Sequence, residues 1–97
     1  SHVHGWLSPE QLSVIRRADE SIGTLLSALD VAGLRESTLI IVTADHGEHD
    51  DLHGTWMPQD MTIPWIVSGP GVIPQTITEP VNVTDTAATA VWALNLP

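Results

Sequence analysis

Two short histidine motifs lie close together in the segment TADHGEHDDLHG and could hold metal ions. Asp45-His46-Gly47 comes first, and His53-Gly54 follows it. A carboxylate oxygen together with imidazole nitrogens suits Zn²⁺, with Mn²⁺ or Fe as further occupants. The chain has no cysteine, so no thiolate can take part. We therefore expect Asp45, His46 and His53 to bind divalent metal.

The other charged residues of this segment allow two interpretations. Glu48, His49, Asp50 and Asp51 could orient the ligand imidazoles through hydrogen bonds. An acidic loop is more commonly a solvated surface, and this is the interpretation we favour for Asp50 and Asp51. His49 is expected to be an ordinary loop residue.

An apolar run directly before the first motif predicts the strand that positions it. Within residues 37–45, the sequence Leu39-Ile40-Ile41-Val42 does not alternate with polar residues. This pattern is typical of a strand that is buried on both faces, as in a parallel sheet covered by helices. Ligands of open α/β sheets bind beyond the carboxyl ends of the strands. The place of the motif therefore supports a functional site.

A long helix is predicted before this strand, over about residues 9–32. Ser8 can cap the helix, Pro9 suits the first helical position, and Gln11 completes a capping box with Ser8. Apolar residues then recur at helical spacing. Gly33 suits the position that follows a helix end.

A loop, a second strand and a second helix are predicted after the first motif. Residues 45–62 are rich in Asp, His, Gly and Pro and indicate the loop, and residues 63–69 indicate the strand, with Pro64 near its start. The stretch VNVTDTAATAVWAL predicts the helix, capped by Thr84 or Asp85. The order helix, strand, loop, strand, helix predicts an α/β fold.

Composition limits the partners of the chain. Its 97 residues are 42% hydrophobic, which allows a packed core. Three arginines and no lysine face twelve acids, for a formal charge of −9, which argues against nucleic acid polymers and anionic membranes as partners. No apolar run approaches the roughly 18 residues of a membrane span. An acidic chain can still act on a phosphate ester if bound cations reverse the local field.

Several stretches resemble one enzyme family. DESIGTLLSALDVAGLRESTLIIVTADHGEHDDLHG looks like the C-terminal part of the alkaline phosphatase superfamily, in the branch of type I phosphodiesterases and nucleotide pyrophosphatases. SHVHGWLSPEQ, MTIPWIVSGPGV and VNVTDTAATAVWALNLP are similar to further family segments, in the same order. The resemblance implies an alkaline-phosphatase-like sheet with helices on both faces. Residues 1–97 would be the C-terminal portion of one catalytic domain, whose missing N-terminal part would supply neighbouring strands.

The resemblance also implies a site for two divalent metal ions, with Zn²⁺ expected and Mn²⁺ or Fe as alternatives. His2 and His53 would bind one ion, and Asp45 and His46 would bind the other. The family's remaining ligands and its nucleophilic Ser or Thr lie upstream of these motifs. We therefore expect no catalytic nucleophile in this chain, and no activity from the chain in isolation.

The function that the resemblance implies is metal-dependent hydrolysis of a small phosphate ester, of the phosphodiesterase or phosphatase type. Two cations about 4 Å apart suit in-line displacement at phosphorus, because they stabilise both the attacking and the leaving oxygen. Export from the cytoplasm is common in the superfamily.

Two other functions stay open. A sulfatase or a metal-dependent phosphomutase would use the same fold. By this resemblance, sulfatases use one Ca²⁺ and tend to replace the histidine of D-H-G, so His46 favours a pair of transition-metal ions. The mutases share T-A-D-H-G but are less similar after that motif. The third possibility is a non-catalytic metal-binding module, which the absence of a nucleophile from this chain supports. A nucleophilic Ser or Thr upstream would decide between an enzyme and such a module.

Overall fold

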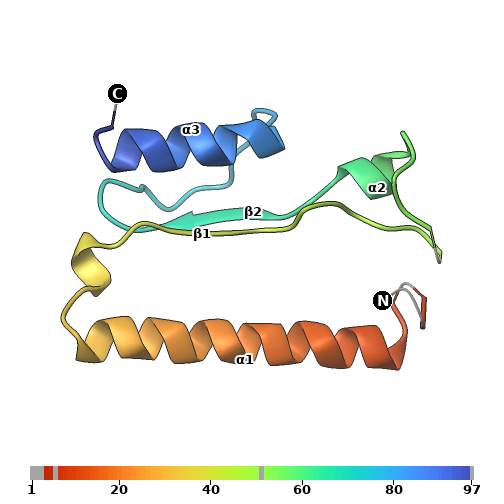
Figure 1. The fold of residues 1–97 in the computed structure, drawn as a ribbon, viewed down its shortest axis with the longest axis horizontal. Helices are drawn as coiled ribbons and strands as arrows, with labels where there is room; N and C mark the ends of the chain where they lie inside the picture. The colour runs from red at the N-terminus through yellow and green to blue at the C-terminus, as the bar shows by residue number, and fades with distance from the viewer. Residues whose placement is uncertain (1–3, 6, 51, 97) are drawn as a thin grey trace.

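The computed structural model describes residues 4–5, 7–50 and 52–96. It contains helix α1 (Pro9–Val31), the 3₁₀ turn η1 (Arg35–Ser37), strand β1 (Ile40–Thr43), helix α2 (Pro58–Met61), strand β2 (Trp65–Ser68) and helix α3 (Val83–Ala93). The predicted α/β class and element order are confirmed, with α2 as a short helix inside the predicted loop. Figure 1 shows the two strands as a middle layer, with α1 on one side and α3 on the other.

Helix α1 begins and ends where the sequence predicts. The Ser8 hydroxyl accepts the Gln11 backbone N–H at 3.1 Å, and Gly33 ends the helix with a φ of +68°, which glycine adopts without a steric penalty. The Gln11 side chain does not close the expected box with Ser8. Its Oε1 accepts the backbone N–H of Leu7 at 2.6 Å instead, so Gln11 holds the segment that precedes the helix.

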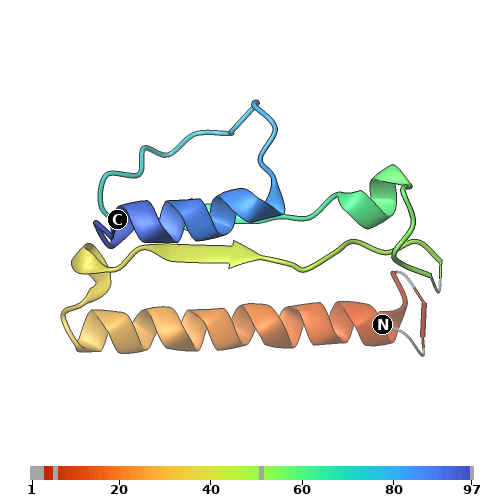
Figure 2. The ribbon, with the colours of Figure 1, turned by 45° about the horizontal axis from the view of Figure 1, so that its top comes forward.

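The two strands pair antiparallel, so the expected parallel sheet is wrong. Ile40 lies opposite Ser68, and Thr43 lies opposite Trp65. A parallel neighbour would need a crossover that returns the chain to the start of β1. Residues 44–64 instead fold back beyond the end of β1, so β2 starts beside that end (Figure 2). An apolar run therefore does not indicate the direction of the neighbouring strand.

The apolar side chains of the described residues stay at least partly exposed. None is buried, although the composition predicts a packed core. Strand β1, expected to be buried on both faces, has three half-buried residues followed by one exposed residue. Among the described residues the sheet has only these two strands, so both are edge strands, and such a small sheet leaves its apolar side chains partly exposed.

Side-chain hydrogen bonds join the strand pair to the elements around it. The Trp65 indole N–H donates to the Thr86 hydroxyl of α3 at 3.0 Å, and Arg35 of η1 donates to the Ser68 hydroxyl at 3.1 Å. The cap of α3 is Asn82 rather than Thr84 or Asp85. Asp85 takes part as the third residue of the helix, because its Oδ2 accepts the Asn82 backbone N–H at 2.7 Å.

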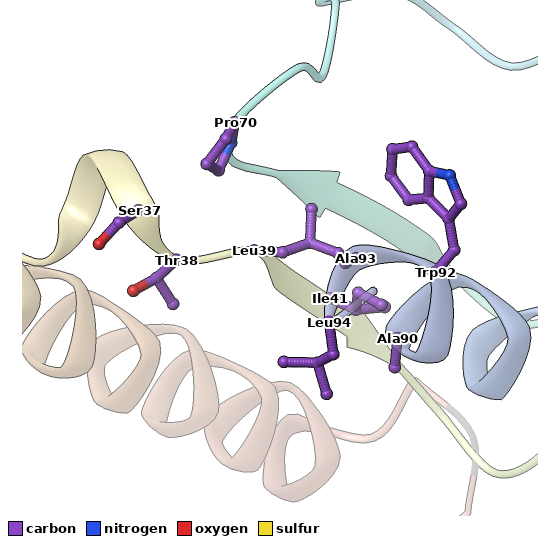
Figure 3. A pocket seen from close by; sticks show the side chains of 9 residues that line it. All are labelled: Ser37, Thr38, Leu39, Ile41, Pro70, Ala90, Trp92, Ala93 and Leu94. Carbon is purple, nitrogen blue, oxygen red and sulfur yellow. The ribbon is translucent and has the colours of Figure 1, made fainter. Parts of the chain in front are cut away.

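An open apolar groove of about 470 Å³ lies between the start of β1 and the C-terminal end of α3 (Figure 3). It is lined by Ser37, Thr38, Leu39, Ile41, Pro70, Ala90, Trp92, Ala93 and Leu94. The histidine motifs follow the other end of β1, so the groove is not part of the candidate site. Among the described residues, no helix combines the length and the apolar character that crossing a membrane requires.

Candidate metal centre

Asp45 and His46 lie directly beyond the carboxyl end of β1, as the sequence predicts. Asp45 Oδ1 accepts the backbone N–H of His46 at 3.0 Å, which sets the direction of the carboxylate. The Asp45 side chain is 88% exposed and the His46 side chain is 39% exposed. The pair is therefore open to solvent and to a ligand, while its backbone continues a paired strand.

A tight turn brings His53 back to His46. His49 and Leu52 exchange two backbone hydrogen bonds of 3.0 and 2.9 Å, and Asp50 adopts a φ of +49°, a conformation that aspartate tolerates better than most residues. The imidazole of His53 then stacks on that of His46, with ring centroids 4.4 Å apart and planes 8° from parallel. The structure thus brings Asp45, His46 and His53 together.

The surroundings of His46 leave one ring nitrogen available for a metal. Its Nδ1 lies 2.7 Å from the carbonyl oxygen of Gly47. A carbonyl oxygen only accepts hydrogen bonds, so Nδ1 carries the proton and the neutral ring keeps its lone pair on Nε2. Histidines that bind metals are commonly oriented by such a bond from their other ring nitrogen.

The donors of Asp45 and His46 fit one divalent ion. His46 Nε2 lies 3.6 Å from Asp45 Oδ2, which is too long for a hydrogen bond. Two donors that share an ion at bond lengths of about 2.1 Å lie about 3 to 3.5 Å apart, close to this separation. Among the residues that the structure describes, no three such side chains are placed to hold one ion. His2, the fourth expected ligand, lies outside the described residues.

Asp60 of α2 connects the two sides of the loop. Its Oδ1 lies 2.6 Å from His49 Nδ1, and its Oδ2 accepts the backbone N–H and the hydroxyl of Thr55 at 2.8 and 2.7 Å. Its backbone carbonyl accepts the N–H of Gly47 at 2.8 Å. The Asp60 side chain is only 1% exposed, so its carboxylate contacts the loop and not solvent.

Glu48 makes a second buried contact beneath the loop. The residue is 5% exposed, and its Oε2 accepts a hydrogen bond from the Gln11 side chain of α1 at 3.4 Å. Its Oε1 is buried and has no hydrogen-bond partner among the described residues. Because Gln11 also holds Leu7, this contact ties the segment before α1 to the residues that follow His46.

Sequence reasoning missed Asp60 and treated His49 as an ordinary loop residue. One signal could have found Asp60, since it is the only charged residue between His53 and Glu79. A lone charge in an apolar stretch is costly to bury unless it is paired. Its partners lie five and eleven positions away, so only the folded loop identifies them.

The His49–Asp60 contact shifts the pKa of both groups. The hydrogen bond from His49 lowers the pKa of Asp60 from 3.8 to about 2, with help from the two Thr55 donors. The hydrogen bond to Asp60 raises the pKa of His49 above its ordinary value of 6.5. Each group thus favours the charged form of the other.

We expect this pair to give the protein a pH-dependent stability. The Asp60 contribution is present above pH 3.8 and is lost as the pH falls toward 2, because its pKa is lower in the folded state. The His49 contribution is complete below pH 6.5 and is lost as the pH rises through its raised pKa. Urea unfolding should therefore show the largest stability difference between wild type and His49→Gln between these limits. A difference that does not change from pH 3 to 8 would contradict the ion pair.

Comparison with known proteins identifies sulfatases as relatives. The profile of the sulfatase family matches residues 9–96. An ulvan-active sulfatase of Formosa agariphila is 31% identical over 78 residues, covering 69% of this chain and 15% of the relative. An arylsulfatase of Chlamydomonas reinhardtii is 35% identical over 60 residues, covering 56% and 9%. An arylsulfatase of Volvox carteri is 28% identical over 78 residues, covering 74% and 12%. No solved structure matches significantly.

These relatives correct the branch that the resemblance indicates. They are sulfatases and not phosphodiesterases. The sulfatase alternative therefore has better support than the expected hydrolysis of phosphate esters. His46 lies within the matched residues, so its presence does not exclude a sulfatase. The chain spans no more than 15% of the length of these three relatives. The family match covers most of the chain, and the chain therefore belongs to the sulfatase family.

Proposed function

We propose that this chain is the C-terminal, metal-binding portion of a catalytic domain that hydrolyses sulfate esters. The observation that carries the proposal is the sulfatase family match over residues 9–96, which includes the loop with Asp45, His46 and His53. The stacking of His46 on His53 and the position of Asp45 at the end of β1 support a site at this loop. The nucleophile and the remaining ligands would come from upstream residues.

Asp45 Oδ2 and His46 Nε2 would hold a divalent ion at the end of β1. When bound, the ion supplies positive charge that stabilises the oxygens of the sulfate group as the ester bond breaks. Asp45 contributes a negative charge for the ion, and the hydrogen bond from Nδ1 to the Gly47 carbonyl orients the His46 ring so that Nε2 would be the donor. The net charge of −9 repels a sulfate ester elsewhere on this chain, so the ion would also localise the substrate.

The carboxylate of Asp45 and the imidazole of His46 limit which metal ion the site would prefer. A carboxylate with an imidazole suits Mn²⁺ or Zn²⁺, whereas Ca²⁺ prefers oxygen donors throughout. Oxygen ligands from upstream could still bring the site closer to the preference of Ca²⁺. His53, with His2, stays the proposed ligand pair for a second ion. Its stacking on His46 supports a location beside the first.

The full-length protein tests the proposal with three chromogenic esters: p-nitrophenyl sulfate, p-nitrophenyl phosphate and bis-p-nitrophenyl phosphate. Each is assayed after chelation and after return of Ca²⁺, Mn²⁺ or Zn²⁺. We expect kcat/KM for the sulfate to exceed both phosphates by at least about 100-fold, equivalent to about 2.7 kcal/mol in transition-state stabilisation. Ulvan serves as a polysaccharide substrate, because one relative is named for it.

Two results would reject the sulfatase proposal. A preference for the phosphate diester would restore the phosphodiesterase interpretation. Metal binding without turnover of any of the four substrates would favour the non-catalytic module. Recovery of activity with one cation and not with the others would identify the ion that the enzyme uses.

A further inference from the structure

Among the described residues, the buried side chains are all polar, and all three lie at the loop of the candidate site or contact it. Gln11, Glu48 and Asp60 are 9%, 5% and 3% exposed, while no apolar side chain among the described residues is buried. Gln11 and Glu48 meet beneath the residues that follow His46. The buried side chains of the described residues therefore form hydrogen bonds and not a hydrophobic core.

Asp60 forms hydrogen bonds at three points of the loop. Its backbone carbonyl accepts the N–H of Gly47, directly after His46, and its carboxylate accepts the N–H and the hydroxyl of Thr55, two residues after His53. Its third partner is His49, at the turn between the two motifs. Asp60 thus contacts the loop on both sides of the His46–His53 stack and at the turn that creates it.

We propose that Asp60 is a positioning residue for the metal centre, which holds His46 and His53 in the arrangement that binds the ion. This inference rests on the proposed function of the loop. Asp60 acts indirectly. Its carboxylate contacts His49 and Thr55, while its bond to Gly47 is made by the backbone carbonyl and is kept in Asp60→Ala. Small displacements of ligands matter, since a site needs its donors held within about 0.5 Å of the binding geometry.

The chemistry of the contact explains why a carboxylate stands at this position. An ionised carboxylate has about four acceptor sites and no donor, so it can accept from His49 and twice from Thr55 at once. An amide at this position keeps its shape but replaces one acceptor with a donor. Two of the three side-chain bonds could then remain, while the bond to the protonated Nδ1 of His49 would be lost.

The experiment measures the affinity of the full-length protein for Mn²⁺ alone, by calorimetry after chelation. We expect Asp60→Ala to weaken binding by about 10-fold to 100-fold, the usual effect of removing a group that orients metal ligands. Asp60→Asn should give a smaller loss, and Thr55→Val, which removes one donor, a smaller loss again. Thermal unfolding of each metal-free variant is recorded in parallel.

Asp85→Asn is the matched control. Asp85 is also an aspartate that accepts a backbone N–H at 2.7 Å beside a helix start, but it lies on α3, away from the loop. We expect this variant to lower the melting temperature and to leave the Mn²⁺ affinity at the wild-type value. A variant that only destabilises the fold would behave in the same way.

The outcomes separate this inference from the proposed function. If the Asp60 and Thr55 variants bind Mn²⁺ as tightly as wild type while still folded, Asp60 has only a structural role and the inference is overturned. If Asp60→Ala does not fold, the order of Asp60→Asn and Thr55→Val decides. If the affinities follow the expected order but wild type does not cleave sulfate esters, the inference stands and the proposed function fails. If wild type binds no Mn²⁺, Ca²⁺ or Zn²⁺, both fail.

Discussion

Replacement of His46 with alanine is expected to lower the metal affinity of the full-length protein by more than about 100-fold, beyond the usual effect of changing a supporting residue. The variant removes the Nε2 lone pair that faces Asp45 Oδ2. It also removes the ring on which His53 stacks. If the proposed function holds, sulfate ester hydrolysis should fall by about 1,000-fold or more, because charge on the sulfate oxygens would no longer be neutralised. Elemental analysis and steady-state kinetics measure the two effects.

His4→Ala is the control for this prediction. His4 is an exposed histidine near the N-terminus that lies outside the Asp45-His46-Gly47 and His53-Gly54 motifs. Its loss should leave metal content and kcat/KM unchanged. Equal metal content in wild type and His46→Ala would remove His46 from the site, and with it the pairing of His46 and Asp45 on one ion.

Gly47→Ala is expected to be the most destabilising small substitution in the loop. A Cβ at this position would overlap the backbone carbonyl oxygen of Gln59 and approach that of Thr62 to 2.8 Å. Both contacts are backbone atoms of the α2 region, which cannot rotate away as a side chain can. We expect a loss of about 1 to 3 kcal/mol in the free energy of unfolding, the usual cost of overpacking. Metal affinity should fall as well, because Gly47 directly follows His46.

Gly23→Ala is expected to change the stability of the protein in the opposite direction. Gly23 lies within α1, and a Cβ there would meet no atom within 4 Å. Alanine favours a helix over glycine by about 1 kcal/mol, so this variant should be more stable than wild type. Urea unfolding curves of the two variants give the comparison. A Gly47→Ala variant as stable as wild type would show that α2 does not pack against the loop as described.

The elements of the fold follow from local features of the sequence. Ser8 and Gly33 mark the ends of α1. The Ser8 hydroxyl accepts a backbone N–H, and Gly33 tolerates a positive φ. Both abilities belong to a single residue, so the sequence alone reveals them. The direction of β2 is not local. It depends on how residues 44–64 return, and an apolar run is the same whether its neighbour is parallel or antiparallel. The burial of the strand side chains also cannot be predicted from the sequence, since it depends on which other elements cover the strands.

In the candidate site, too, some features are local in the sequence and others depend on the fold. Residue types and their place after a strand predict Asp45, His46 and His53, and the structure brings the three together. The branch of the superfamily does not follow from these residues, because His46 is compatible with both. The partners of Asp60 cannot be predicted either, because an isolated aspartate in the sequence does not indicate which residues it contacts.

By itself, the sequence determined the order of helices and strands and which donors stand beyond β1, because capping, turn formation and metal preference are properties of short segments. Tertiary structure decided the antiparallel pairing of β1 with β2, the stacking of His46 on His53 and the contacts of Asp60 with His49 and Thr55. These features join residues up to 28 positions apart, such as Ile40 and Ser68. The free energy of such contacts depends on how the intervening chain folds back, which no local pattern encodes.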